Sequence, residues 1–285
     1  MKIGAIVQAR TSSTRLPRKI LMDLPYNSGI TVLQNVLRRL KRSKFIEEIV
    51  VATTTDVPDQ EIIEVAKGES VRFFRGNKED VLERYYFAAK EYGFDIIVRI
   101  TSDCPCIDPM VIDDVIRKHL NTGSDYTSNT LLRTYPDGLD VEVFNFDTLH
   151  DAYKNAKSKS EREHVTSYIH TTAKESFKTC NVVSSEFDAP DIRITLDTIE
   201  DYVLLCTIFD YLYPENEFFS SKDVINLFNK KPWLKLINAK IIQKNSFKTF
   251  EEEKKEAIKV LKMQDLNRIA NYLEDINNSN KYQVS

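Results

Sequence analysis

A group of cations and hydroxyl side chains follows the first apolar run of the chain, residues 3–7. Four cations lie within ten residues: Arg10, Arg15, Arg18 and Lys19. Four hydroxyl side chains lie between the first two of them: Thr11, Ser12, Ser13 and Thr14. Together these groups could bind a polyanion, most simply a phosphate chain. A solvated loop that is basic without a function is the alternative, because short clusters of cations are common.

Two acidic residues occupy a second position that could do chemistry. Asp103 comes shortly after the apolar run 95–100, and Asp197 comes directly after the alternating run 191–196. If both runs are strands, the two carboxylates lie at strand carboxyl ends, where open sheets bind ligands. Magnesium commonly takes one or two carboxylates together with phosphate oxygens and water. The pair therefore predicts a magnesium site that faces the cationic loop, and capping of a helix or turn by either aspartate is the alternative.

The first half of the chain alternates between strand and helix patterns. Short apolar runs predict buried strands at residues 3–7, 48–54, 71–74 and 95–100. Four helices are expected after these strands: 31–43, 60–66, one that begins at the cap Asn77 and ends at Gly93, and one from Asp108 to about Leu120. This alternation is typical of a parallel, doubly wound α/β sheet.

The pattern changes in the second half. Residues 139–144 and 191–196 alternate between apolar and polar side chains, which predicts antiparallel or edge strands. Helices are expected at 147–157 and at 160–173, the second with a capping box formed by Ser160 and Glu163. Thr198 is expected to cap a helix at 200–211, and Ser220 is expected to cap another.

The composition excludes several classes of protein. The chain has 285 residues, 42% of them hydrophobic, and a net charge of −3, so it can bury a large core and is not a general nucleic-acid binder. The basic stretch 38–44 could contact nucleic acid, but cations at a helix end also complement the helix dipole. No signal peptide and no membrane span are expected. The four cysteines lack metal-ligand spacing, which predicts reduced thiols in a cytoplasmic protein.

The composition shifts at residue 244, which divides the chain into a first domain, residues 1–243, and a charged extension, residues 244–285. Residues 250–276 of the extension predict a helical segment with an apolar stripe that includes Met263, Leu266, Ala270 and Leu273. A stripe of this kind must be buried. Packing on the chain's own first domain and packing in a homodimer are the two alternatives.

Six blocks of sequence resemble one known family and lie in the same order. They are QARTSSTRLPRK (8–19), RGNKEDVLERYYFAAKEYG (75–93), DIIVRITSDCPCIDP (95–109), DGLDVEVF (137–144), EREHVTSYI (161–169) and RITLDTIED (193–201). The blocks resemble cytidylyltransferases of the spore-coat polysaccharide type, relatives of the synthetases that make CMP-activated keto-sugar acids. The resemblance implies an α/β nucleotidyltransferase fold of the glycosyltransferase-A type, a three-layer sandwich with a mixed, mostly parallel sheet.

The resemblance also implies an activity. A CMP group would pass from CTP to a sugar acid or a similar anionic acceptor, with release of pyrophosphate, in the biosynthesis of a surface polysaccharide. Mg²⁺ would be the cofactor. One alternative is a sugar-phosphate nucleotidyltransferase that uses another nucleotide. A second alternative is a non-catalytic nucleotide-binding scaffold of the same fold.

Carried onto this sequence, the resemblance implies four sets of site residues. The catalytic cations would be Arg10, Arg15 and Lys19. The nucleotide would be bound by Ala9, Arg10, Thr11, Ser13, Thr14, Lys19, Asn77, Asp80 and Arg84. The acceptor side would be formed by Asp137, Gly138, Glu163 and His164. The magnesium ligands would be Asp103 and Asp197. His164 is a candidate general base, and a structural role for this histidine is the alternative.

The cationic loop departs from the family pattern at two positions. Ser12 and Arg18 stand where relatives commonly have glycine. Glycine lets a backbone approach phosphate closely and adopt left-handed conformations. The geometry of this loop is therefore the part of the resemblance that most needs a structural test.

Overall fold

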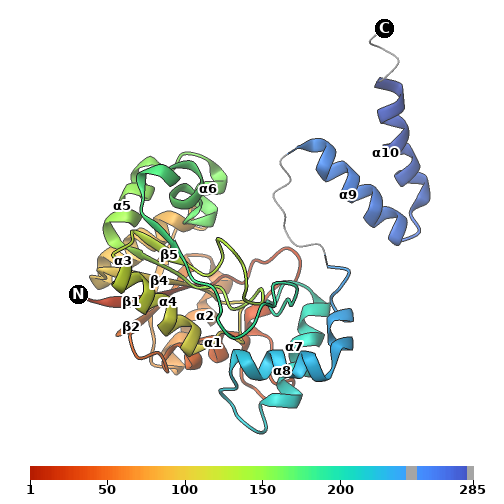
Figure 1. The fold of residues 1–285 in the computed structure, drawn as a ribbon. Coiled ribbons are helices and arrows are strands. Elements are labelled where there is room, and N and C mark those ends of the chain that lie inside the picture. Colours follow the sequence, from red (N-terminus) through yellow and green to blue (C-terminus); the bar gives the residue numbers. More distant parts are fainter. Residues whose placement is uncertain (242–248, 281–285) are drawn as a thin grey trace. The chain divides into compact units, whose positions relative to one another are not determined.

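The computed structural model describes residues 1–241 and 249–280 of the chain (Figure 1). The chain consists of two compact units, Met1–Lys240 and Ile241–Ser285. The predicted domain boundary after residue 243 lies outside the described residues. Every helix within the described ranges is too short or too polar to cross a bilayer.

Within the described residues, seven strands form one mixed sheet in the larger unit, in the order β3-β2-β1-β4-β6-β5-β7. The strands are β1 (Ile3–Gln8), β2 (Glu48–Thr54), β3 (Arg72–Gly76), β4 (Ile96–Thr101), β5 (Tyr126–Ser128), β6 (Glu142–Asn145) and β7 (Thr179–Asn181). The first four strands of this order run parallel, and β6 is antiparallel to both of its neighbours. The carboxyl ends of β1, β2 and β4 therefore meet at one edge of the sheet.

Helices cover both faces of this sheet (Figure 1). They are α1 (Val32–Leu40), α2 (Gln60–Gly68), α3 (Val81–Tyr92), α4 (Pro109–Thr122), α5 (Phe146–Asn155), α6 (Lys159–His164), α7 (Ile199–Leu212) and α8 (Ser221–Lys230). Ala5 and Val7 of β1 share an apolar core with α1, α2, α4, α7 and α8, whereas Ile6 shares a second core with α3 and α5. Successive residues of a strand point to opposite faces, so the two cores lie on opposite sides of the sheet. The predicted three-layer α/β fold with a mostly parallel sheet is confirmed.

Local sequence signals determine several helix ends. Thr198 and Ser220 each accept a hydrogen bond from the backbone N–H three residues further on, and they begin α7 and α8. The Asp108 carboxylate accepts from the Met110 N–H in front of α4. Gly93 ends α3 in the left-handed conformation, with φ 65°. The caps predicted at these four positions are confirmed.

Two predicted helix starts are wrong. Asp80 rather than Asn77 caps α3, because Asp80 Oδ1 accepts from the Glu83 N–H at 2.8 Å. Helix α6 begins after Ser158, which forms a capping box with Glu161, and not at residue 160. The sequence has two overlapping boxes with the same spacing, and the structure uses the earlier one. The single helix predicted at 160–173 is also wrong: α6 ends at residue 164, and a short π-helix, η3 (Tyr168–Thr172), follows it.

The predicted strand 191–196 is also wrong. This segment makes one isolated bridge, between Arg193 and Asp137, and joins no strand of the sheet. Its backbone pairs with loops instead: the Ile194 N–H donates to the Asp137 carbonyl at 2.7 Å, and the Leu196 N–H donates to the Asp103 carbonyl at 2.9 Å. The alternating pattern arises because one side of the segment faces the core and the other side faces a polar network.

The smaller unit is a pair of helices, α9 (Phe250–Met263) and α10 (Asn267–Asn280). The chain turns between them at Asp265, which has φ 56°. The helical character predicted for 250–276 is confirmed, but this turn breaks the segment into two helices. The strands β5 and β7 are three residues long, and no sequence pattern predicts them.

Candidate active site

The cationic loop, residues 9–19, and both candidate aspartates lie at the carboxyl edge of the sheet. The loop follows β1, and Asp103 follows β4, the parallel neighbour of β1. Asp197 directly precedes the cap of α7. The hydrogen bond from the Leu196 N–H to the Asp103 carbonyl ties these last two segments together. The fold therefore brings three distant parts of the sequence to one place.

The ammonium group of Lys19 joins the two aspartates. Its Nζ donates to Asp103 Oδ2 at 2.6 Å, to Asp197 Oδ1 at 2.9 Å and to the Leu196 carbonyl at 2.6 Å. These acceptors use all three N–H donors of the ammonium. The side chain is 10% exposed, and burial by itself would lower the pKa of Lys19, but the two carboxylates raise this pKa above its ordinary value. Lys19 is thus a fixed positive charge.

The second oxygen of Asp197, Oδ2, forms ion pairs with two further cations. Arg15 and Arg193 each approach Oδ2 at 2.8 Å. Burial would raise the pKa of the Asp197 carboxyl, but Lys19, Arg193 and Arg15 together hold this pKa well below its usual range. Asp197 therefore stays ionised at any physiological pH.

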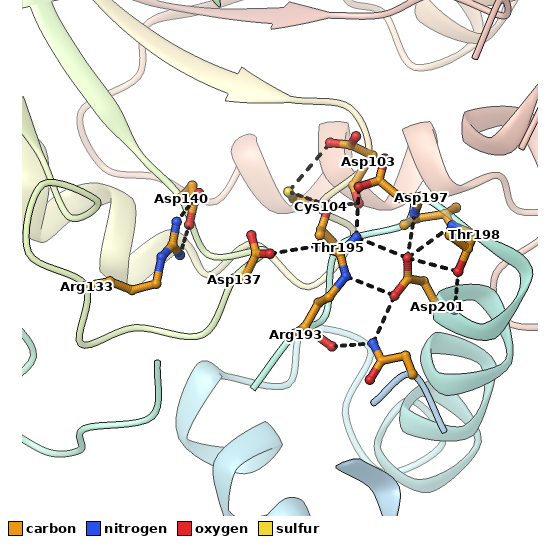
Figure 2. A network of polar contacts seen from close by, with 12 residues as sticks. Asp103, Cys104, Arg133, Asp137, Asp140, Arg193, Thr195, Asp197, Thr198 and Asp201 are labelled. Atoms are coloured by element: carbon orange, nitrogen blue, oxygen red, sulfur yellow. Dashed lines mark hydrogen bonds and ion pairs between the residues drawn. The ribbon is translucent and has the colours of Figure 1, made fainter. Parts of the chain in front are cut away.

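Arg193 is the centre of a polar network behind Asp197 (Figure 2). Its guanidinium contacts Asp137 at 2.9 Å, Asp197 at 2.8 Å and Asp201 at 3.1 Å. Asn238 completes the network through hydrogen bonds to the Arg193 carbonyl and to Asp201. Burial would lower the pKa of Arg193, but the three carboxylates raise it. This arginine fixes the orientation of Asp197 from the side opposite Lys19.

Asp59 holds the backbone of the cationic loop. Its Oδ1 accepts from the Thr11 N–H at 2.8 Å and from the Thr11 hydroxyl at 2.6 Å, and its Oδ2 accepts from the Thr54 hydroxyl at 2.5 Å. All three residues are buried. Burial would raise the pKa of the Asp59 carboxyl, but these hydrogen bonds lower it. This carboxylate thus joins the start of the loop after β1 to Thr54 at the end of β2.

The loop adopts a left-handed turn without glycine. Arg18 has φ 60° and ψ 18°, the conformation that the resemblance assigns to a glycine position. The Thr11 carbonyl accepts from the Ser13 and Arg18 N–H groups at 3.0 and 2.9 Å, which closes the loop. The Arg18 guanidinium also makes two hydrogen bonds to Glu61. The loop therefore keeps a compact shape at the position where the sequence departs from the family pattern.

The residues predicted to bind the nucleotide fall into two groups. Ala9, Thr11, Ser13 and Thr14 lie on the loop beside Arg10 and Lys19. Arg84 of α3 is buried, donates to the Asn77 carbonyl at 2.7 Å and has no hydrogen-bond partner for Nε among the described residues. Asp80 pairs with Arg162 rather than with the loop. Burial lowers the pKa of Arg84.

The residues predicted for the acceptor side lie in two places. Asp137 and Gly138 pack against the 193–195 segment, where Gly138 has φ 113° and a Cβ atom would lie 2.8 Å from the Ile194 carbonyl carbon. Glu163 lies on α6, with its carboxylate 3.6 Å from the Arg10 guanidinium. His164 ends the same helix. Glu163 is therefore joined to the cationic loop, and Asp137 is joined to the Asp197 segment through Arg193.

Asp103 and Asp197 are suited to a magnesium ion. Both carboxylates approach one cationic atom, Lys19 Nζ, so their oxygens are close enough to share a cation. In the part of the chain that the structure describes, no group of three or more His, Cys, Asp or Glu side chains could enclose a metal ion. Two carboxylates completed by phosphate oxygens and water are the set that magnesium commonly takes.

Comparison with known proteins assigns the family. A family model described as cytidylyltransferase matches residues 4–220. The chain belongs to the cytidylyltransferase family. The matched range contains the cationic loop, Asp103, Arg193 and Asp197, and it ends before α9 and α10.

Two relatives match most of the length of this cytidylyltransferase, and a third matches less than half of it. It is 32% identical to the spore coat polysaccharide biosynthesis protein SpsF of Bacillus subtilis over 232 residues, 80% of this chain and 94% of that protein. It is 40% identical to protein MJ1063 of Methanocaldococcus jannaschii over 258 residues, 88% of this chain and 100% of that protein. A 3-deoxy-manno-octulosonate cytidylyltransferase of Geobacter sulfurreducens is 35% identical over 116 residues, 41% of this chain and 44% of that enzyme.

Solved structures support the same fold. A cytidylyltransferase from Leptospira borgpetersenii is similar with a TM-score of 0.76 and 37% identity, covering 87% of this chain and 100% of that one. A CMP:2-keto-3-deoxy-manno-octonic acid synthetase in complex with CTP has a TM-score of 0.54 and 15% identity, covering 74% of this chain and 99% of that one. At this low identity the second structure supports the fold alone.

Asp59 and Arg193 organise the cytidylyltransferase site but are absent from the predicted site residues. Arg193 lies within a block that carries the family resemblance, and its position four residues before Asp197 could have indicated a contact. Asp59 lies in a short turn, η2 (Val57–Asp59), between two predicted elements. Its role depends on contact with Thr11, which is 48 residues away in the sequence, so no local pattern indicates it.

Replacing Asp59 tests whether its hydrogen bonds to Thr11 stabilise the cationic loop. We expect Asp59→Ala to reduce the free energy of unfolding by about 1–3 kcal/mol at pH 7, because buried donors lose their acceptor. We also expect it to raise the KM for CTP.

The pH dependence of unfolding gives a second test of Asp59. The pKa of the Asp59 carboxyl is lower in the folded chain than in the unfolded chain, where it is about 3.9, so the ionised carboxylate stabilises the fold above this pH. This stabilisation is lost as the pH falls from about 3.9 through the lower pKa of the folded state. Urea unfolding between pH 7 and pH 3 should therefore show a shallower acid dependence for Asp59→Asn than for wild type.

The matched control for Asp59 is Asp151→Asn at an exposed position of α5. This variant should leave the KM for CTP unchanged and should not alter the acid dependence of unfolding as Asp59→Asn does. An Asp59→Ala protein with wild-type stability and wild-type KM for CTP would show that the loop does not depend on this carboxylate.

Replacing Arg193 tests the orientation of Asp197. Lysine keeps the charge of Arg193 but lacks the planar fork that reaches three carboxylates. We expect Arg193→Lys to fold and to lower kcat or the apparent affinity for Mg²⁺ by roughly 10–100-fold. Arg133→Lys is the matched control, because the guanidinium of Arg133 forms a bidentate pair with Asp140 rather than with Asp197. Equal effects of the two substitutions on a Mg²⁺ titration of pyrophosphate release would contradict the assignment.

Proposed function

We propose that this cytidylyltransferase transfers a CMP group from CTP to an anionic sugar-acid acceptor and releases pyrophosphate. The observation that carries the proposal is the convergence of Asp103 and Asp197 on Lys19, directly beside the cationic loop. Two carboxylates and several cations at the carboxyl edge of a parallel sheet suit a nucleoside triphosphate with its metal ion. The matched family supports cytidine as the base.

The reaction requires an in-line displacement at the α-phosphorus of CTP. An oxygen of the acceptor forms the new P–O bond while the bond to pyrophosphate breaks, and negative charge accumulates on the leaving group. Catalysis of this kind consists mainly of positioning and of charge neutralisation. Arg10 and Arg15, with side chains 40% and 33% exposed, are the loop cations that would contact the triphosphate. Arg18 is more exposed, at 52%, but its guanidinium is bound to Glu61.

Lys19 differs from these arginines because its three donors are already occupied. A phosphate oxygen can bind the ammonium only by replacing Asp103, Asp197 or the Leu196 carbonyl as an acceptor. We infer that Lys19 keeps both aspartates in place before the nucleotide enters and stabilises the pyrophosphate charge once one acceptor has been exchanged. Asp103 and Asp197 would hold Mg²⁺, which when bound supplies further neutralisation of phosphate charge.

The names of two relatives support the class of acceptor. One acts in spore coat polysaccharide biosynthesis, and another is named for 3-deoxy-manno-octulosonate, a sugar acid. In this chain the acceptor would bind between Asp137 with Gly138 and the α6 residues Glu163 and His164. Such an acceptor is also expected in the cytoplasm together with CTP. His164 remains the candidate general base.

Pyrophosphate release tests the proposed function directly. We expect turnover with CTP and Mg²⁺ in the presence of 3-deoxy-manno-octulosonate or another 2-keto sugar acid, and much slower turnover with UTP, GTP or ATP. Preference for another nucleotide would favour a sugar-phosphate nucleotidyltransferase. Nucleotide binding without pyrophosphate release from any acid in the panel would favour a scaffold.

Replacing Lys19 tests its double role. We expect Lys19→Met to lower kcat by roughly 10²–10³-fold, the usual loss when a group that stabilises developing charge is removed. The two buried carboxylates also lose their shared cation, so the thermal unfolding temperature should fall when Mg²⁺ is absent. Excess Mg²⁺ should restore the unfolding temperature but not kcat. Lys222→Met, at an exposed lysine, is the control and should change neither quantity.

A further inference from the structure

The chain makes a strained turn directly after α6. Val165 has φ 60° and ψ −59°, and the Thr166 N–H donates to the His164 carbonyl at 2.6 Å. This is the rare, strained form of the γ-turn, and it is especially unfavourable for a β-branched residue. The hydroxyl oxygen of Ser167 is buried and has no hydrogen-bond partner within the described part of the chain. The turn is thus unfavourable in two respects, so contacts with other segments must determine its shape.

A buried carboxylate makes the contact that holds this turn. Glu142 of β6 has a side chain only 9% exposed, and its Oε1 accepts from the hydroxyls of Thr166 and Tyr126, both at 2.6 Å. Its Oε2 pairs with the guanidinium of Arg99. Burial would raise the pKa of the Glu142 carboxyl, but Arg99 and the two hydroxyls lower it. Thr166 is therefore bound to an ionised carboxylate, and hydrogen bonds to a charged acceptor are the stronger ones.

The same network reaches the start of the cationic loop. Arg99 lies on β4, the parallel neighbour of β1. Its Nη2 donates at 3.3 Å to Oε1 of Gln8, the last residue of β1, after which the cationic loop begins. Side-chain contacts from Thr166 through Glu142 and Arg99 to Gln8 therefore join the strained turn to the strand from which the loop leaves the sheet.

Helix α6 lies between two anchors. Before its last turn, Arg162 donates from Nε to Asp80 Oδ2 at 2.8 Å. After its last turn, Thr166 is bound to the buried carboxylate of β6. Glu163 and His164, which are expected to face the acceptor, lie between these two contacts. The carboxylate of Glu163 meets the cationic loop only in a partly exposed ion pair at 3.6 Å, and such a pair contributes little. The two anchors therefore determine where this end of α6 lies.

We propose that Thr166 and Glu142 are positioning residues for the acceptor, because their hydrogen bond maintains the strained turn and so holds Glu163 and His164 beside the cationic loop. The inference rests on the proposed transfer of CMP to a sugar acid. It assigns to two residues outside the predicted site the task of orienting the acceptor side. Lys19 holds the aspartates for the metal through separate contacts. Loss of the Thr166 anchor should therefore disturb the acceptor and leave the nucleotide in place.

Thr166→Val removes the hydroxyl and keeps the size and branching of the side chain. We expect this variant to raise the KM for the acid acceptor about tenfold, with 3-deoxy-manno-octulosonate as the first probe, because a hydrogen bond to a charged group is lost. The KM for CTP should not change. Thr166→Ser retains the hydroxyl and should restore the KM of wild type. Initial rates of pyrophosphate release, with each substrate varied in turn, measure both constants.

Thr127→Val is the matched control. Thr127 of β5 is also fully buried, and its hydroxyl lies within hydrogen-bond distance of His119 Nδ1, at 3.0 Å. It follows Tyr126 directly, so it points to the opposite face of the sheet from the Glu142 network. This variant should lower the unfolding temperature but should leave both KM values unchanged. In hydrogen exchange followed by mass spectrometry, peptides from residues 158–172 should exchange faster in Thr166→Val and at the wild-type rate in Thr127→Val.

The outcomes distinguish this inference from the proposed function. Faster exchange in Thr166→Val with an unchanged KM for the acid would show that the anchor serves stability alone, and CMP transfer would stand without the positioning role. An equal rise in both KM values would also overturn the positioning role, because the effect would not be specific to the acceptor. If wild type released no pyrophosphate with any acid, the proposed function would fail and the positioning role with it.

Discussion

The buried ammonium of Lys19 is the contact on which the arrangement of the site depends. Asp103 and Asp197 end segments from different parts of the chain, and both carboxylates are largely removed from solvent. Two carboxylates this close repel each other unless a cation lies between them. Because Lys19 supplies this cation from the end of the cationic loop, the loop must turn back toward the sheet. The direction in which the loop turns and the closeness of the two aspartates therefore share one physical cause.

Asp197 is held from two sides, and this links the two halves of the site. One oxygen faces Lys19, and the other faces Arg15 and Arg193. Arg193 also binds Asp137, whose loop fits closely against the 193–195 backbone because position 138 has no side chain. A shift of the 137–138 loop would consequently move Arg193 and with it the carboxylate of Asp197. The segment expected to contact the acceptor is thus coupled through Arg193 to the segment expected to hold the metal.

Sequence patterns predict the strands and helix caps that depend on neighbouring residues in the chain. They fail for segments whose conformation is determined by contacts between distant residues. The strand 48–54 and the caps Thr198 and Ser220 have local causes, and the structure contains all three. The alternation at 191–196 has the period of a strand, yet the segment binds loops because Arg193 must reach three carboxylates. At α6 two equivalent capping boxes overlap, so local signals could not choose between Ser158 and Ser160. The positions of Asp103 and Asp197 after apolar runs predicted them as a pair, and the family resemblance agreed. No sequence pattern indicated Asp59, because its role depends on its contact with Thr11 in the folded loop.

The conformation of Arg18 bears on whether the chain is an enzyme or only a scaffold. A residue other than glycine in the left-handed region costs about 1–2 kcal/mol, so a loop without glycine could have relaxed to another shape. It has not relaxed, because the Thr11 carbonyl accepts from the Arg18 N–H and Asp59 holds Thr11 in turn. The contacts between Arg18 and Glu61 lie at the exposed surface and leave Lys19 pointing at the aspartates. The missing glycine is therefore compensated by buried hydrogen bonds, and it gives no reason to prefer a scaffold that has lost its catalytic geometry.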